Sequence, residues 1–210
     1  GAYLKERFRR LCIPLVFGVL VIVPPQAYIA RFQQPGYAES YGRFLLDYFR
    51  VRGDLTGYTG QFTPAHLWFI LYLLVFSAVA LPLFLYLRRD RRVIGWLARE
   101  CGRPGALLLL AVPVGIAGAL PDIGGKNPFY YFMLFLYGYV MAGDNRFQEA
   151  VDRSKARALL LGAITMTITL TLWAMRVRFT AYSPGDVLFY LVRTFNMWFW
   201  IIALLGYARK

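Results

Sequence analysis

One apolar run constrains the fold of this chain more than any other feature. It opens at Thr63, carries no charge from Leu67 to Leu87, and ends with four arginines within the five residues 88–92. About twenty apolar residues is the length that an α-helix needs to cross the hydrocarbon core of a bilayer. Trp68 and the aromatic residues after it suit one membrane boundary, and arginines are retained on the cytoplasmic side. The run therefore predicts a membrane-spanning helix with a cytoplasmic C-terminal end.

The composition extends this interpretation to the whole chain. Of its 210 residues, 59% are hydrophobic and 18% are aromatic. They occur in long runs, whereas the apolar residues of a soluble domain form periodic stripes. The net charge of +13 comes from basic residues that lie between these runs. That pattern orients a membrane protein and does not indicate nucleic-acid binding. We expect an all-α, polytopic integral membrane helix bundle whose partner is the lipid bilayer.

Six apolar runs predict about six transmembrane helices. With the N-terminus inside, the cytoplasmic segments hold sixteen Lys and Arg residues and the outer segments hold seven. This excess predicts that both ends of the chain are cytoplasmic. Prolines at 14, 24 and 25 are expected to kink or break the first span. The predicted spans are residues 11–29, 67–87, 105–120, 128–142, 158–175 and 187–207.

Two further segments have a recognisable pattern. Residues 31–63 form a polar connection, predicted to be extracytoplasmic, in which apolar side chains recur at helical spacing from Tyr41 to Phe49. That pattern predicts an amphipathic helix on the membrane surface. Residues 144–157 are charged and compatible with a helix. The threonines at 165, 167, 169 and 171 are expected to hydrogen-bond to carbonyls of their own helix.

Candidate functional residues are few, because metal-ligand spacing, a catalytic triad and a phosphate-binding glycine loop are all absent from the sequence. Arg7 and Arg10 are one helical turn apart, so they either bind a phosphate or carboxylate or only orient the helix. His66, the one histidine, acts as a general base or anchors its helix at the interface beside Trp68. Arg193 lies inside the sixth span and either faces an inner cavity or extends to the interface.

Two strings resemble the acyltransferase 3 family of membrane O-acyltransferases. The first is residues 5–11 (KERFRRL), followed by the prolines at 14, 24 and 25, and the second is residues 66–73 (HLWFILYL) after a long outer loop. The resemblance covers the whole chain and is closest to the branch with the periplasmic-glucan succinyltransferases. An Arg-x-x-Arg motif precedes such a span in that family, and Arg7 and Arg10 match it.

The resemblance implies an enzyme of the bacterial inner (cytoplasmic) membrane. It would move an acetyl- or succinyl-type group from a cytoplasmic acyl-CoA co-substrate to a hydroxyl of a carbohydrate or other cell-envelope acceptor, with no bound cofactor or metal. Arg7 and Arg10 would bind the donor, and His66 and Trp68 would lie on the acceptor side. The family's catalytic histidine usually lies in a helix before the Arg-x-x-Arg motif. We therefore expect residues 1–210 to be one partial domain, truncated at both ends and without a catalytic residue of its own.

Two other functions remain open on the sequence. A transporter or flippase for an anionic or sugar-linked substrate would use Arg193 and the broken helices to line its path. A structural or assembly subunit would carry no chemistry. Two more apolar spans upstream, the first with a histidine, would favour the enzyme.

Overall fold

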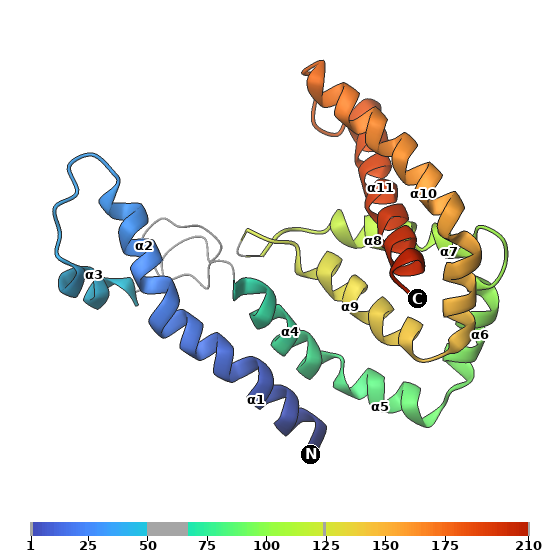
Figure 1. The fold of residues 1–210 in the computed structure, drawn as a ribbon, viewed down its shortest axis with the longest axis horizontal. Helices are drawn as coiled ribbons and strands as arrows, with labels where there is room; N and C mark the ends of the chain where they lie inside the picture. Colours follow the sequence, from blue (N-terminus) through green and yellow to red (C-terminus); the bar gives the residue numbers. More distant parts are fainter. Residues whose placement is uncertain (1, 50–66, 124, 210) are drawn as a thin grey trace. The chain divides into compact units, whose positions relative to one another are not determined.

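The chain is helical, as the sequence predicts. The computed structural model describes residues 2–49, 67–123 and 125–209, and within them no strand forms apart from an isolated bridge between Ile123 and Lys126. The elements in chain order are α1 (Ala2–Phe17), the π-helical turn η1 (Gly18–Ile22), α2 (Val23–Phe32), α3 (Tyr41–Tyr48), α4 (Trp68–Val79), α5 (Leu81–Arg89), α6 (Arg92–Cys101), α7 (Ala106–Leu109), α8 (Ala111–Gly118), α9 (Pro128–Ala142), α10 (Asn145–Ala174) and α11 (Pro184–Ala208) (Figure 1).

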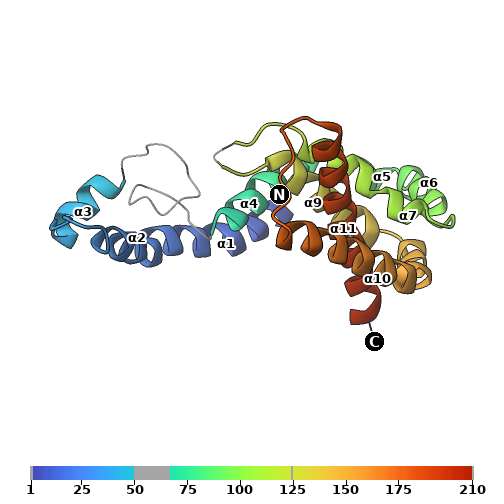
Figure 2. The ribbon, with the colours of Figure 1, turned by 90° about the horizontal axis from the view of Figure 1, so that it is seen from above.

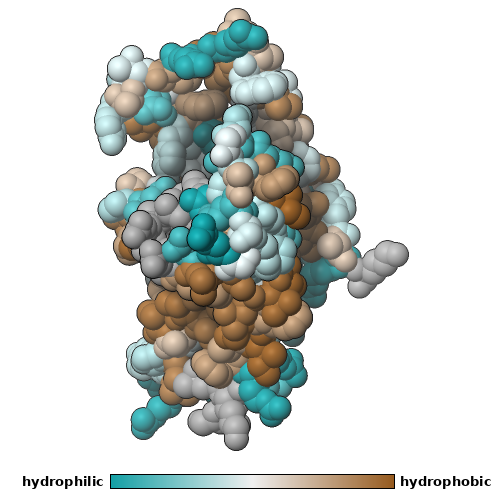
Figure 3. All heavy atoms as spheres, turned by 90° about the vertical axis from the view of Figure 1, so that its left-hand side faces the viewer, coloured by the Kyte–Doolittle hydropathy of each residue, from teal (hydrophilic) through white to brown (hydrophobic). Residues whose placement is uncertain are grey.

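Three to five of these elements are long and apolar enough to span a membrane. Phe8–Phe32, α10 and α11 qualify alone, and two bent pairs, α4 with α5 and α6 with α7–α8, qualify if each pair is one span. The fourth predicted span, residues 128–142, is α9, which is apolar but has only 15 residues. Large apolar side chains are exposed along α1 and η1, such as Ile13 at 61% and Phe17 at 57%. Hydrophobic residues also form a broad area on the face seen in Figure 3, as expected for helices in contact with lipid.

The chain divides into two compact units, Gly1–Phe84 with Pro121–Tyr131, and Leu85–Leu120 with Phe132–Lys210. In the first unit the helix continues through its prolines instead of breaking. Pro24 and Pro25 have no N–H, so two carbonyls one turn earlier lose their donors. In η1 the Val23 N–H donates to the Gly18 carbonyl, five residues back. Such a local π-helical adjustment re-satisfies the backbone at a proline site in a membrane helix.

The amphipathic helix α3 packs on α2. Phe44 and Tyr48, which share one face of α3, are completely buried against Val23 and Ala27 of α2. Leu46, on another face, is 81% exposed. The apolar face that the sequence assigns to the membrane surface is therefore used, at these two positions, for contact with the protein.

In the second unit α10 is a single helix of 30 residues, about 45 Å long. The predicted charged segment and fifth span are thus one element, which starts where the Asp144 side chain accepts from the Arg146 N–H. The threonine prediction is confirmed at three positions, since the hydroxyls of Thr165, Thr167 and Thr169 donate to carbonyls four residues earlier.

The helices α10 and α11 lie side by side in both ribbon views (Figure 1, Figure 2). They approach closely at Gly162, where an added Cβ would be 3.5 Å from the Trp200 ring. The Asn196 Nδ2 donates to the Gly162 carbonyl at 2.9 Å and to Thr165 Oγ1 at 2.8 Å. A small residue at the crossing and side-chain hydrogen bonds across it are what membrane helix pairs use for association.

Two hydrogen bonds join the short helices α7 and α8 to α11. The Trp198 Nε1 donates to the Leu107 carbonyl at 2.9 Å, and the Tyr190 hydroxyl donates to the Gly115 carbonyl at 2.7 Å. The chain reaches α7 through a bend of 109° after α6. Gly105 lies in this bend with φ +82°, a conformation that favours glycine.

Candidate functional site

The arginine pair predicted to bind the donor lies on α1. Arg7 and Arg10 are three positions apart on this helix, and the side chain of Arg7 lies outside the described part of the structure. Arg10 Nη2 is 2.6 Å from Glu6 Oε1, and the Arg10 side chain is 77% exposed. An exposed ion pair of this kind is weak. The guanidinium of Arg10 is therefore accessible to an anion that binds it more tightly than Glu6 does.

An aromatic cluster forms at the start of α4, and we define it by Trp68, Tyr72 and Tyr131. The Trp68 and Tyr131 ring centroids are 4.9 Å apart, and Trp68 and Tyr72 are 5.4 Å apart. Lys126 Nζ lies 5.5 Å from the Trp68 ring, within reach of a cation–π interaction. The Tyr72 hydroxyl donates to the Ile123 carbonyl at 3.3 Å. The cluster thus combines α4, the turn before α9 and the start of α9.

The aromatic cluster presents the side-chain types that suit a carbohydrate. Trp68, Tyr72 and Tyr131 are half-buried, so part of each ring remains accessible. Such rings offer an apolar face together with a polar N–H or O–H group. Sugars expose C–H faces and hydroxyls, which match these two properties. His66, the other residue predicted for this side, lies outside the described residues.

The start of α4 lies beside the middle of the first span. A Cβ on Gly18 would collide with the Leu67 side chain, and from there α4 runs antiparallel along α1 (Figure 1). Gly18 is ten residues into the span Phe8–Phe32. It follows Arg10 by eight residues, which is about 12 Å along the helix axis. The aromatic cluster and the arginine motif therefore belong to neighbouring helices of one unit.

Arg193 lies on an exposed face of α11, one turn after Phe189. Its guanidinium carbon is 5.9 Å from the centroid of the Phe189 ring. This outward position is the one expected for an arginine that extends to the interface. Anion binding at Arg193 stays a prediction.

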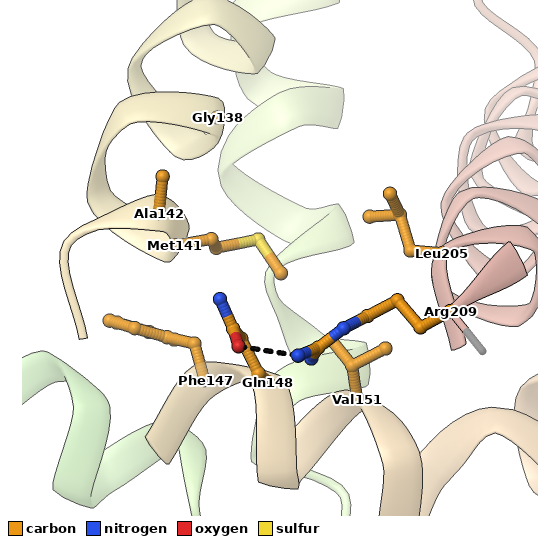
Figure 4. A pocket seen from close by; sticks show the side chains of 8 residues that line it. All are labelled: Gly138, Met141, Ala142, Phe147, Gln148, Val151, Leu205 and Arg209. Atoms are coloured by element: carbon orange, nitrogen blue, oxygen red, sulfur yellow. Dashed lines mark hydrogen bonds between the residues drawn. The ribbon is translucent and has the colours of Figure 1, made fainter. Parts of the chain in front are cut away.

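A cavity of about 250 Å³ opens between α9, α10 and α11, inside the second unit. Two of its lining side chains are polar, and Arg209 Nη2 donates to Gln148 Oε1 at 2.6 Å. Figure 4 shows this hydrogen bond crossing one side of the cavity, below Met141 and Leu205. The lining residues are Gly138, Met141, Ala142, Phe147, Gln148, Val151, Leu205 and Arg209.

Comparison with protein families shows which family the chain belongs to. A model of the acyltransferase 3 family, described as an acyltransferase domain, matches residues 1–210. The chain belongs to this family. Comparison with curated proteins and with solved structures gives no significant match. The family assignment supports a membrane acyltransferase, in agreement with the helices that are long and apolar enough to span a membrane.

The sequence indicated some of the candidate site residues of this acyltransferase and missed others. It selected Arg10 and Trp68, which the structure places on the neighbouring helices α1 and α4. It missed Tyr131, which contacts Trp68 from 63 residues away, and Gln148, which faces Arg209. The aromatic richness of the fourth span was the one available signal for Tyr131. Gln148 had no signal, because nothing in the sequence distinguishes this amide from the other polar residues of its charged segment.

Proposed function

We propose that this acyltransferase transfers an acetyl- or succinyl-type group from acyl-CoA, on the cytoplasmic side of the bacterial inner membrane, to a hydroxyl of a carbohydrate or other cell-envelope acceptor. One observation carries the proposal. The aromatic cluster begins at Trp68, beside the middle of the first span, and Arg10 lies about 12 Å along α1 from that level. Donor and acceptor determinants on adjacent helices can hold two substrates close enough to react. Succinyl transfer to a glucan is the first donor–acceptor pair to test.

The donor end of the proposal rests on Arg7 and Arg10. Acyl-CoA is polyanionic, and guanidinium groups bind phosphate oxygens through paired, charge-assisted hydrogen bonds. Arg10 is exposed, and its present partner Glu6, on the preceding turn of α1, is itself 62% exposed. A phosphate that displaces Glu6 would leave the carboxylate free in water, which costs little.

The acceptor end rests on the aromatic cluster. A sugar ring stacked on Trp68 or Tyr131 would place its hydroxyls near Lys126, whose ammonium lies over the Trp68 ring. This ammonium can donate to a hydroxyl oxygen and orient it. The cluster would therefore bind and orient the acceptor, with His66 beside it in sequence.

The chemistry is acyl transfer from sulfur to oxygen. The acceptor oxygen attacks the thioester carbonyl, the carbon–sulfur bond breaks, and an ester and free CoA thiol result. A general base must take the hydroxyl proton. We propose that a histidine in a helix before the Arg-x-x-Arg motif has this role, as the resemblance to the family implies.

Substitution of the arginines tests the donor site. In the full-length protein reconstituted into liposomes with acyl-CoA and a glucan acceptor, we predict that Arg7→Ala and Arg10→Ala each abolish acyl transfer while expression persists. Arg9→Ala is the matched control, because Arg9 lies on the same turn but points about 100° away from Arg10. It should retain the wild-type rate. Wild-type transfer by Arg7→Ala or Arg10→Ala would exclude a donor role for the motif.

A further inference from the structure

The cavity between α9, α10 and α11 has two polar side chains, the Arg209 guanidinium and the Gln148 amide, and both carry hydrogen-bond donors. A guanidinium cannot accept, so the Gln148 carbonyl oxygen must face Arg209. The amide nitrogen of Gln148 is thereby turned the other way, toward Met141 and the cavity (Figure 4). The remaining lining is apolar. A ligand with an acceptor or anionic group next to an apolar portion complements this lining.

The positive charge at this cavity is not neutralised by the described residues. Gln148 is uncharged, and within the described part of the chain no carboxylate forms an ion pair with Arg209. Asp144, the N-cap of α10, pairs with Arg146, and Asp152 pairs with Lys155. Glu149 of α10 is exposed and, among the described residues, forms no ion pair with Arg209. A bound anion would therefore supply the missing charge.

The cavity opens onto a surface that suits lipid. Gly138 and Ala142 at its edge are exposed, and an added Cβ on Gly138 would have no atom within 4 Å. On α11, Leu204 is 62% exposed and Tyr207 is 53% exposed. Arg209 follows the last residue of this membrane-spanning helix. A basic residue at that position lies at the level of the lipid headgroups, beside the acyl chains.

We propose that this cavity is a binding site for an anionic phospholipid. The lipid phosphate accepts from Arg209 and from the Gln148 amide, and the start of one acyl chain lies between Met141, Val151 and Leu205. The volume of about 250 Å³ equals that of about eight water molecules. It holds the phosphate and part of a chain, while the rest of the lipid stays in the bilayer. This site is separate from the arginine motif and the aromatic cluster, and does not depend on the proposed acyl transfer.

Two substitutions test the two halves of the site. Arg209→Gln removes the charge, and each basic residue near an anionic lipid surface contributes about fivefold in affinity. Gly138→Leu puts a side chain into the open edge of the cavity, and leucine is a better helix former than glycine, so the fold is retained. Arg153→Gln is the control, because it removes the same charge from α10 on the side that faces Gly102, away from the cavity.

Binding is measured with the delipidated full-length protein in a neutral detergent, by native mass spectrometry and by thermal shift. The probes are phosphatidylglycerol, phosphatidylcholine with the same chains, and inorganic phosphate. We expect preferential binding of phosphatidylglycerol, weakened about fivefold by Arg209→Gln, weakened also by Gly138→Leu, and unchanged by Arg153→Gln. Equal binding of both lipids, or unchanged binding by the Arg209 variant, would overturn the proposal. Equal protection by inorganic phosphate would reassign the cavity to a small anion.

Discussion

In the proposed function, Trp68 is the residue on which acceptor binding would depend most. It contacts Tyr72 on its own helix and Tyr131 from α9, and Lys126 lies over its ring. Removal of its side chain therefore disrupts the aromatic cluster at its centre. The proposed donor site on α1 does not include this side chain, so loss of Trp68 should change the KM of the two substrates differently.

We predict that Trp68→Ala and Tyr131→Ala raise the KM for a carbohydrate acceptor and leave the KM for acyl-CoA unchanged. Contact with a large apolar side chain contributes roughly 1.5–3 kcal/mol, which corresponds to a change in KM of about tenfold or more. Steady-state kinetics with each substrate varied in turn measures both values. Phe129→Ala is the control, because Phe129 is 40% exposed at the start of α9 and outside the cluster. Equal changes in both KM values would argue against a role specific to the acceptor.

Residue spacing along the sequence predicts which side chains share one face of a helix, but not which residues of another helix they contact. The interval between Arg7 and Arg10 defines one face of a helix, and that prediction needs no tertiary contact. The pairs Trp68–Tyr131 and Gln148–Arg209 join residues about sixty positions apart. No periodicity within one helix specifies such partners, so they required the structure.

The bounds of α10 in the structure differ from the bounds of the apolar run that the sequence contains. The sequence separates a charged segment from an apolar span, but nothing between residues 145 and 174 stops a helix except Gly162, which one helix tolerates. The same reasoning explains the first span, where a π-helical turn accommodates the proline pair. Hydropathy reports which part of a helix meets lipid, whereas caps and breakers decide where it begins and ends.

We predict that the stability of the first turn of α10 depends on pH, because Asp144 caps this turn. The Arg146 guanidinium and backbone N–H donate to its carboxylate and lower its pKa from 3.8 to about 2. A folded-state pKa below the unfolded value means that the charged form stabilises the fold above pH 3.8. That contribution is lost as the pH falls toward 2.

Two variants distinguish the contribution of the N-cap hydrogen bond of Asp144 from that of its negative charge. Asp144→Ala removes both and should cost about 1 kcal/mol at pH 7, whereas Asp144→Asn keeps a good N-cap and should cost less. Thermal unfolding in detergent from pH 7 to pH 2.5 measures this. The difference between the unfolding free energies of wild type and Asp144→Asn should be constant above about pH 5 and shrink progressively below it. A difference that is independent of pH over the whole range would contradict the charge contribution.

The class of the molecule was readable from the sequence, while the number of spans was not. Long uncharged runs and their basic ends predict an all-α membrane protein, and the family match agrees with the resemblance of its motifs. Six runs became three to five possible spans, because α4 with α5 and α6 with α7–α8 are pairs bent by 51° and 109°, and α9 has only 15 residues. Hydropathy does not reveal such bends, since a bent pair and a straight helix have the same composition.

The measurement that tests the central claim most directly is acyl transfer across a sealed vesicle. The full-length protein is reconstituted with a carbohydrate acceptor inside the vesicles, and acyl-CoA is added outside. For molecules with the cytoplasmic face outward, we predict an acyl ester on the enclosed acceptor and an equal amount of CoA thiol released outside. Movement of the acceptor through the membrane with acyl-CoA left intact would contradict an acyltransferase and favour a transporter.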